Sequence, residues 1–301
     1  MATTKNWMSS LSDEITLDKL SIPGTHDSGT QKTGSGPAHT QNFGIRNQLD
    51  NGIRFLDIRV TYKKSNPSDD PLQIYHGIIN CDISFGNVLN DCVNFLNENP
   101  RETIIMLVNS ASGSDTNIQQ YFDVYLNQSR YQNLFYLQSV PTNLGAMRKK
   151  VVLFRRYLGT GGVDLSQPGA WKDNQTFPLT TPQGVRFFIE DQYSQHDTKK
   201  KWNAVESNLY TAMNHPTDGI IYITFNSVSQ GAHTPYQYAW GGGIGKVDPK
   251  MNPVLQSYLE SNQGTKRFGI IPLDFFNNET GHINNRNTEL IINSNPGVKL
   301  T

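Results

Sequence analysis

The sequence contains no hydrophobic run long enough to span a bilayer and no excess of charge of either sign. A transmembrane helix needs about 18 or more consecutive apolar residues, and no such run occurs. Lys and Arg together number 26, as do Asp and Glu, so the formal net charge is zero. A protein that binds nucleic acid usually carries a basic excess or stripe, and the three lysines at 199–201 fit a solvated helix start. We therefore expect neither a membrane-spanning protein nor a nucleic-acid binder.

Cysteine is scarce as well, with only Cys81 and Cys92. Two cysteines exclude a disulfide-rich scaffold, and their spacing matches no zinc site. Cys92 falls on the apolar face of a predicted helix, which favours a buried free thiol. The first ten residues, MATTKNWMSS, lack the basic and apolar regions of a signal peptide. We expect a secreted protein whose signal has been removed and replaced by a start Met, or alternatively a cytoplasmic one.

Apolar segments of strand length alternate with helical patterns along the 301 residues. Near-continuous apolar strands are typical of a parallel sheet that is buried on both faces. Helical periodicity covers 84–100, with Ser84 as the cap, and also 202–215, 252–262 and 288–294. The eight predicted strands are 18–22, 53–60, 72–77, 103–108, 151–156, 185–191, 219–225 and 267–275.

This alternation predicts an α/β fold, a single distorted or incomplete (β/α)8 barrel. The segment 157–184 is rich in Gly, Pro and Thr and shows no helical period, so we expect the barrel to be irregular there. No internal repeat and no linker interrupts the chain. We therefore predict one catalytic domain over residues 1–301.

Polar side chains follow almost every predicted strand at its carboxyl end. In a barrel these ends converge on one mouth, where barrel enzymes carry out their chemistry. The side chains predicted to meet there are His26, Asp27, Asp57, Arg59, His76, Asn109, Arg156, Glu190, Asp191, Tyr193, Asn226 and Asp274. Arg155 alternates with Arg156 along its strand, so we expect it to point away from the mouth.

Two histidines in this ring, His26 and His76, suit general acid–base catalysis, since one can take a proton while the other gives one. Arginine fits phosphate oxygens, and Arg59 and Arg156 both belong to the ring. Together these residues predict a site that cleaves phosphodiesters without a metal. The group that attacks phosphorus could be water or a hydroxyl of the substrate. A structural ion pair between Asp57 and Arg59, two apart on one strand, is the alternative for those two residues.

Seven motifs occur in an order that resembles a known family. They are IPGTHDSG (22–29), RFLDIR (54–59), YHG (75–77), ETIIM (102–106), VVLFRRY (151–157), EDQY (190–193) and the aspartate of PLDF (272–275). The chain resembles the bacterial phosphatidylinositol-specific phospholipases C, relatives of the eukaryotic phospholipase C catalytic domain, over nearly its whole length. The resemblance implies a distorted (β/α)8 barrel and a two-step reaction. The inositol 2-hydroxyl displaces diacylglycerol to form inositol 1,2-cyclic phosphate, which water then opens slowly.

The resemblance also implies a role for each catalytic residue. His26 would be the general base on the 2-hydroxyl, with Asp274 orienting it. His76 would be the general acid that protonates the leaving oxygen, assisted by Asp27. Arg59 would bind the phosphate oxygens.

The implied substrate-binding residues complete the site. Asp57 would lie beside Arg59, Arg156 and Asp191 would hold inositol hydroxyls, and Tyr193 would stack on the ring. One position departs from the family. Metal-independent members carry a lysine after the fourth strand, where this chain has Asn109.

We expect no cofactor, because in metal-independent members an arginine stands where calcium-dependent relatives have a calcium ligand, and Arg59 fills that position. A fixed guanidinium supplies the electrostatic stabilisation of a cation. The runner-up is calcium held by Asp27, Asp57 and Asn109, in a metal-dependent phosphodiesterase. A barrel that binds phosphoinositide or carbohydrate without turnover is a third hypothesis, from a different class.

The predicted partner is phosphatidylinositol in a membrane. We expect a monomeric enzyme that contacts the membrane peripherally. The loop 233–245 offers Tyr236, Tyr238 and Trp240 among glycines. Amphipathic aromatic rings suit the headgroup zone of a bilayer, so these three are predicted to contact the membrane. Ordinary packing of the rings beneath the loop is the alternative.

Overall fold

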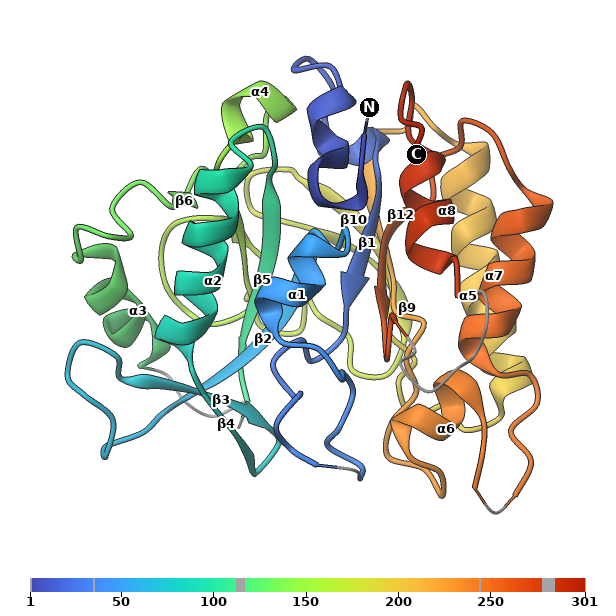
Figure 1. Cartoon of the computed structure of the whole chain (residues 1–301), viewed down its shortest axis with the longest axis horizontal. Helices are drawn as coiled ribbons and strands as arrows, with labels where there is room; N and C mark the ends of the chain where they lie inside the picture. The colour runs from blue at the N-terminus through green and yellow to red at the C-terminus, as the bar shows by residue number, and fades with distance from the viewer. Residues whose placement is uncertain (1, 35, 112–116, 244, 278–284, 301) are drawn as a thin grey trace.

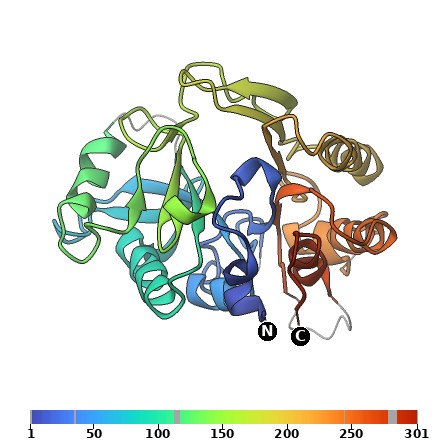
Figure 2. The ribbon, with the colours of Figure 1, turned by 90° about the horizontal axis from the view of Figure 1, so that it is seen from above.

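The structure is a computed structural model that describes residues 2–34, 36–111, 117–243, 245–277 and 285–300. One curled sheet lies at its centre and helices lie outside it (Figures 1 and 2). Seven strands run parallel in the spatial order β7–β5–β2–β1–β12–β11–β10. Their bounds are β1 Ser21–Thr25, β2 Phe55–Tyr62, β5 Ile104–Ser110, β7 Val151–Arg155, β10 Arg186–Glu190, β11 Ile220–Thr224 and β12 Gly269–Leu273.

Short strands complete the two edges of the sheet. β6 (Phe135–Tyr136) and β8 (Val163–Asp164) both pair with β7 in parallel, while β9 (Thr176–Thr180) pairs with β10 in antiparallel. No ladder joins these two edges within the part of the chain that the structure describes. The prediction of a distorted or incomplete barrel is therefore confirmed, and β8 and β9 fall in the segment 157–184 that lacks helical periodicity.

The third predicted barrel strand has a different role from the one expected. β3 (Leu72–His76) pairs antiparallel with β2 and with β4 (Ile79–Ser84), which the sequence analysis missed. A two-residue turn joins β3 to β4, and a turn this short allows only antiparallel pairing, since a parallel neighbour needs a long crossover. Gly77, with φ of 56°, supplies the left-handed conformation that the turn requires.

Helices cover the outside of the sheet. The α-helices are α1 Ile45–Asp50, α2 Phe85–Glu98, α3 Ile118–Leu126, α4 Leu144–Met147, α5 Thr198–Asn214, α6 Pro235–Trp240, α7 Met251–Ser261 and α8 Asn287–Asn293, preceded by 3-10 turns η1 Thr4–Ser10 and η2 Leu17–Lys19. Ser84 caps α2 as predicted, accepting a hydrogen bond from the Asn87 amide. No helix in the described ranges is long and apolar enough to cross a membrane.

Apolar side chains form two main buried layers. One lies between the sheet and the helices and includes Ile58, Phe95 and Leu255. The other fills the inside of the curled sheet, where Phe154 of β7 meets Phe187 of β10 edge to face, with ring centroids 5.5 Å apart. Side chains thus bridge the interior between two strands that share no hydrogen bonds.

The two cysteines and the lysines at 199–201 differ in how they agree with prediction. Cys81 and Cys92 are both free and buried, as expected of Cys92. The expectation for 199–201 is wrong in part, because Lys201 is fully buried with its Nζ 2.8 Å from both carboxylate oxygens of Glu190. A lysine is almost never fully buried unless a carboxylate neutralises its charge.

Candidate active site

A cavity of about 330 Å³ opens at the carboxyl ends of the parallel strands. Its lining includes His26, Asp27, Arg59, His76, Asn109, Arg156, Asp173, Asp191, Tyr193 and Gln230. A larger cavity of about 540 Å³ lies among the chain termini, and its lining holds no histidine and no carboxylate. We therefore place the candidate site in the smaller cavity, because histidines, carboxylates and arginines converge there.

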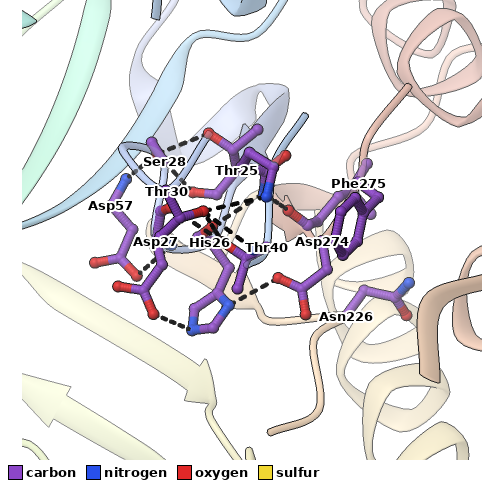
Figure 3. A network of polar contacts seen from close by, with 12 residues as sticks. Thr25, His26, Asp27, Ser28, Thr30, Thr40, Asp57, Asn226, Asp274 and Phe275 are labelled. Carbon is purple, nitrogen blue, oxygen red and sulfur yellow. Dashed lines mark hydrogen bonds and ion pairs between the residues drawn. The ribbon is translucent and has the colours of Figure 1, made fainter. Parts of the chain in front are cut away.

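The pairing of β1 with β12 brings His26 to Asp274. Thr25 is registered against Leu273, so the next residue of each strand lies side by side at the mouth. The Nδ1 of His26 lies 2.8 Å from Oδ1 of Asp274, and both side chains are buried (Figure 3). This contact leaves the other ring nitrogen, Nε2, on the side of Asp27 and Arg59.

The electrostatic surroundings of His26 favour its protonated form. Burial opposes the charge on the imidazole, but the carboxylates of Asp274 and Asp27 outweigh that effect and raise the pKa of His26 to about 9. Burial raises the pKa of Asp274 above its usual range, while the neighbouring imidazole lowers it. The pair is thus arranged to hold and release a proton.

Backbone contacts fix the turn that follows β1 (Figure 3). The Thr40 hydroxyl lies 3.1 Å from the carbonyl oxygens of both His26 and Asp27 and can donate to either, and the side-chain amide of Gln41 donates to the carbonyl oxygens of His26 and Leu273. Asp27 adopts φ of 43°, a left-handed conformation that is costly for a residue other than glycine. Its amide donates to the Asp57 carboxylate at 3.2 Å, so the neighbouring strand holds the strained turn in place.

Asp27 joins the two histidines to the arginine. Its Oδ2 lies 3.3 Å from His26 Nε2 and 3.1 Å from His76 Nδ1, while its Oδ1 lies 2.7 Å from Arg59 Nε. Burial would raise the pKa of Asp27, but Arg59 and then the two histidines outweigh burial and hold it below the usual range. A carboxylate in this position can stabilise positive charge on either imidazole.

Arg59 presents its guanidinium at the floor of the cavity. Besides Asp27 it approaches Asp57, whose Oδ2 lies 3.7 Å from its Nη2, and its Nη2 lies 3.2 Å from His26 Nε2. Burial opposes its charge, but Asp27 and Asp57 more than compensate and raise its pKa. Asn109 stands beside it, because the two residues are registered partners on β2 and β5.

The same corner holds Asp27, Asp57 and Asn109, the residues of the alternative calcium site. Ligand atoms of His26, Asp27 and Asp57 lie within 4.8 Å of one another, which is close enough for a cation, and Asn109 lines the same cavity. The Arg59 guanidinium already contacts both carboxylates. A cation bound there would have to share them with a fixed positive charge, so the donor set fits a metal poorly.

One wall of the cavity groups Arg156 and Asp191 around a residue that sequence analysis missed. Trp171 donates its indole N–H to Asp191 at 2.8 Å, and the Arg156 guanidinium lies 3.7 Å from the centre of its ring. Burial raises the pKa of Asp191, and burial together with Arg59 lowers that of Arg156 to about 10. Trp171 therefore orients a carboxylate and a guanidinium at once.

Asp173 is a second missed residue of this wall. It accepts a hydrogen bond from the Tyr193 hydroxyl at 2.8 Å, and burial with this bond raises the pKa of Tyr193 to about 12. The only sequence signal was the short polar-aromatic run WKD inside an aperiodic segment.

The structure thus brings together the ten predicted catalytic and substrate-binding side chains. Asp57 and Asp274 support the cavity from behind, while His26, Asp27, Arg59, His76, Asn109, Arg156, Asp191 and Tyr193 line it. Arg155 points elsewhere as expected, to a buried contact with Asp164 at 3.2 Å. Glu190 is also outside the lining, in its ion pair with Lys201.

The predicted membrane residues need correction. Residues 235–240 form helix α6 rather than an open loop, and residue 244 lies outside the described residues. Tyr238 is buried against His196 and His233, and Trp240 is buried and donates its indole N–H to the Phe275 carbonyl. Two of the three rings therefore pack inside the protein, and Tyr236, half-buried against Phe275, is the one with an accessible surface.

Known proteins resemble the chain in sequence and in structure. Residues 21–157 match the family model for the phosphatidylinositol-specific phospholipase C X domain. The 1-phosphatidylinositol phosphodiesterase of Staphylococcus aureus strain Newman is 30% identical over 289 residues, covering 90% of this chain and 88% of that protein. The Listeria monocytogenes protein of the same name is 30% identical over 300 residues, covering 92% and 83%.

Solved structures agree with these matches. A phosphatidylinositol-specific phospholipase C from Staphylococcus aureus superposes with a TM-score of 0.83 at 29% identity, covering 97% of this chain and 98% of that one. The Listeria monocytogenes enzyme superposes with a TM-score of 0.73 at 26% identity, covering 98% and 99%. The chain therefore belongs to the family of bacterial phosphatidylinositol-specific phospholipases C.

Proposed function

We propose that this protein cleaves phosphatidylinositol into diacylglycerol and inositol 1,2-cyclic phosphate, and that it then hydrolyses the cyclic ester slowly to inositol 1-phosphate. The observation that carries the proposal is the contact of His26 and His76 with one carboxylate oxygen of Asp27, beside the Arg59 guanidinium. The two imidazoles are close enough to act on one phosphodiester, one as the acid and the other as the base. The guanidinium beside them can bind its phosphate oxygens.

In the first step the inositol 2-hydroxyl gives its proton to Nε2 of His26 while its oxygen attacks phosphorus. Asp274, on Nδ1, fixes the ring orientation and stabilises the imidazolium that forms. The bond from phosphorus to the glycerol oxygen breaks, and protonated His76 gives a proton to that oxygen. In the second step water attacks phosphorus and His76 takes the proton of the water. The bond from phosphorus to the 2-oxygen breaks, and His26 returns its proton to that oxygen.

Charge on the phosphate oxygens grows as the attacking oxygen approaches phosphorus. Arg59, held by Asp27 and Asp57, is fixed before the substrate arrives and stabilises that charge without rearranging. We propose that this arrangement replaces a metal, so that the reaction needs no cofactor. Asp27 also balances the proton on His76, because its Oδ2 contacts the Nδ1 of that ring.

The wall formed by Arg156 and Asp191 would bind the inositol ring through its hydroxyls. Both side chains are fixed by Trp171, and Tyr193 offers an aromatic face held by Asp173. Asn109, which also lines the cavity, would contribute an uncharged amide to the same ring. We propose a monomer that meets the membrane only peripherally, and secretion of the protein stays a prediction.

The direct test is diacylglycerol release from vesicles. Phosphatidylinositol vesicles should yield diacylglycerol, whereas phosphatidylcholine vesicles should yield none, because the wall around Asp191 is built for a ring of hydroxyls. Quantifying diacylglycerol by mass spectrometry measures both. Cleavage of glycerophosphodiesters in place of phosphatidylinositol would favour the metal-dependent phosphodiesterase, and binding without cleavage would favour a barrel that binds carbohydrate or phosphoinositide without turnover.

A further inference from the structure

An apolar tip lies beside the active-site cavity. Ile78 is 93% exposed, more than any other large hydrophobic side chain in the described ranges, and its neighbour Ile79 is 44% exposed. Both belong to the turn region of the β3–β4 hairpin, which stands at the end of the molecule where the parallel strands terminate (Figure 1). Two adjacent, exposed β-branched residues need an explanation that a single exposed apolar residue does not.

The hairpin geometry places this tip at the rim of the site. Ile79 is the direct cross-strand partner of His76, and opposed residues of an antiparallel pair project from the same face. His76 contacts Asp27 in the cavity, so Ile79 stands next to the predicted general acid. Ile78 follows at the turn itself, one residue further out.

The base of the hairpin is anchored. Cys81 and Ile83, which follow Ile79 along β4, are both buried. Asn80 accepts a hydrogen bond from the Gln73 side chain at 2.9 Å. The exposed isoleucines thus extend a buried apolar row outward on a support that is already ordered, which reduces the entropy lost on binding.

We infer that Ile78 and Ile79 insert into the lipid bilayer and hold the mouth of the cavity against it. The inference rests on the proposed function, because a diacylglycerol ester keeps its chains in the bilayer while its headgroup must reach His76. A zero net charge provides no strong pull toward anionic lipid, so apolar burial is the available source of affinity. The exposed charge on β4, Asp82, lies three residues beyond Ile79, where a left-handed backbone with φ of 54° interrupts the regular alternation of the strand.

The test is the partition of single variants onto phosphatidylcholine vesicles that contain no inositol lipid, measured by sedimentation. Ile78→Ser should lower the partition coefficient about tenfold, since a buried isoleucine contributes roughly one factor of ten or more. Adding Ile79→Ser should lower it further, and Ile78→Trp should raise it. The matched control is Val140→Ser, which removes a 43%-exposed β-branched side chain near the amino ends of β10 and β11, at the opposite end of the sheet.

Turnover separates this inference from the proposed function. Ile78→Ser should cleave phosphatidylinositol vesicles more slowly and a water-soluble inositol phosphodiester at the parental rate. Unchanged vesicle partition in the double variant would overturn the inference and leave the proposed function standing. The inference would also be overturned if the parental protein formed a dimer without lipid and Ile78→Ser dissociated that dimer, because the tip would then bind a second copy of the chain. If neither the parental protein nor any variant cleaves phosphatidylinositol, the proposed function is wrong, and the partition measurements still decide whether Ile78 and Ile79 enter the bilayer.

Discussion

Replacing either histidine of the cavity should nearly abolish cleavage of phosphatidylinositol. His26→Ala and His76→Ala are each expected to reduce kcat by about 10²–10⁴-fold, the usual contribution of a positioned acid or base. His76 lines the cavity, whereas His26 is buried against Asp274 and Asp27, so the folded state of each variant is measured together with its rate. Stopped assays on vesicles measure the loss, and circular dichroism reports the fold.

The matched control is His215→Ala, an exposed histidine that follows α5 and lies outside the cavity. It should retain the parental rate. The proposed mechanism would be wrong if either cavity variant also kept a near-parental rate while folded. Loss in only one of the two would leave one proton transfer to solvent and would contradict the paired acid–base scheme.

The pH profile identifies which histidine is the base. His26 must be neutral to accept a proton, and its pKa is raised to about 9, so kcat/KM should rise with pH through a limb that lies above the ordinary histidine value of 6.5. Asp274→Asn removes a carboxylate that raises this pKa, so the limb should move to lower pH while the rate falls. A limb that stays in place in this variant would exclude His26 as the titrating base.

Arg59→Lys is expected to lose about 10²–10³ in kcat, comparable to removing one fixed donor to a developing anion. Lysine keeps the positive charge but lacks the planar fork that reaches Asp27 and phosphate together. Kinetics with a water-soluble inositol phosphodiester isolate this effect from membrane binding. The control is Arg46→Lys, a surface arginine paired with Glu98 that should leave the rate unchanged.

The melting temperature of the same variant tests whether Arg59 acts on the phosphate or only supports the fold. If Arg59 were only a structural partner of Asp57, the lysine variant would show a lower melting temperature and a nearly normal rate. An unchanged melting temperature with a large loss in kcat is the outcome that we expect. The loss should not be rescued by added calcium in the lysine variant, since a positive charge still occupies the same corner.

Much of the site could be predicted because its residues stand directly after strands. His26 and Asp274 each follow an apolar strand, and barrel geometry requires such positions to converge. That they touch depends on the register of Thr25 against Leu273, which no local pattern specifies. The sequence therefore predicts which residues gather, and the structure adds which of them pair.

The errors have physical causes as well. The apolar pattern of 72–77 indicates a strand but not its direction, which is decided by the tight turn after His76. Trp171 and Asp173 were missed because they lie in an irregular segment that tertiary contacts alone hold.

Helix α6 carried a signal that was available in the sequence. Thr234 and Gln237 form a capping box with Pro235 at the first helical position. Reading that motif would have predicted a helix at 235–240, and hence an inward side for some of its aromatic rings.

Phosphorus NMR of the water-soluble product, with and without a chelator, tests the central claim most directly. The claim is that the inositol 2-hydroxyl attacks a phosphate held by Arg59 without a metal. We expect the signal of a five-membered cyclic phosphodiester first, a phosphomonoester signal later, and the same time course in chelator. A monoester that forms without the cyclic compound would contradict intramolecular attack, and a cyclic signal that disappears on chelation would contradict the role of Arg59.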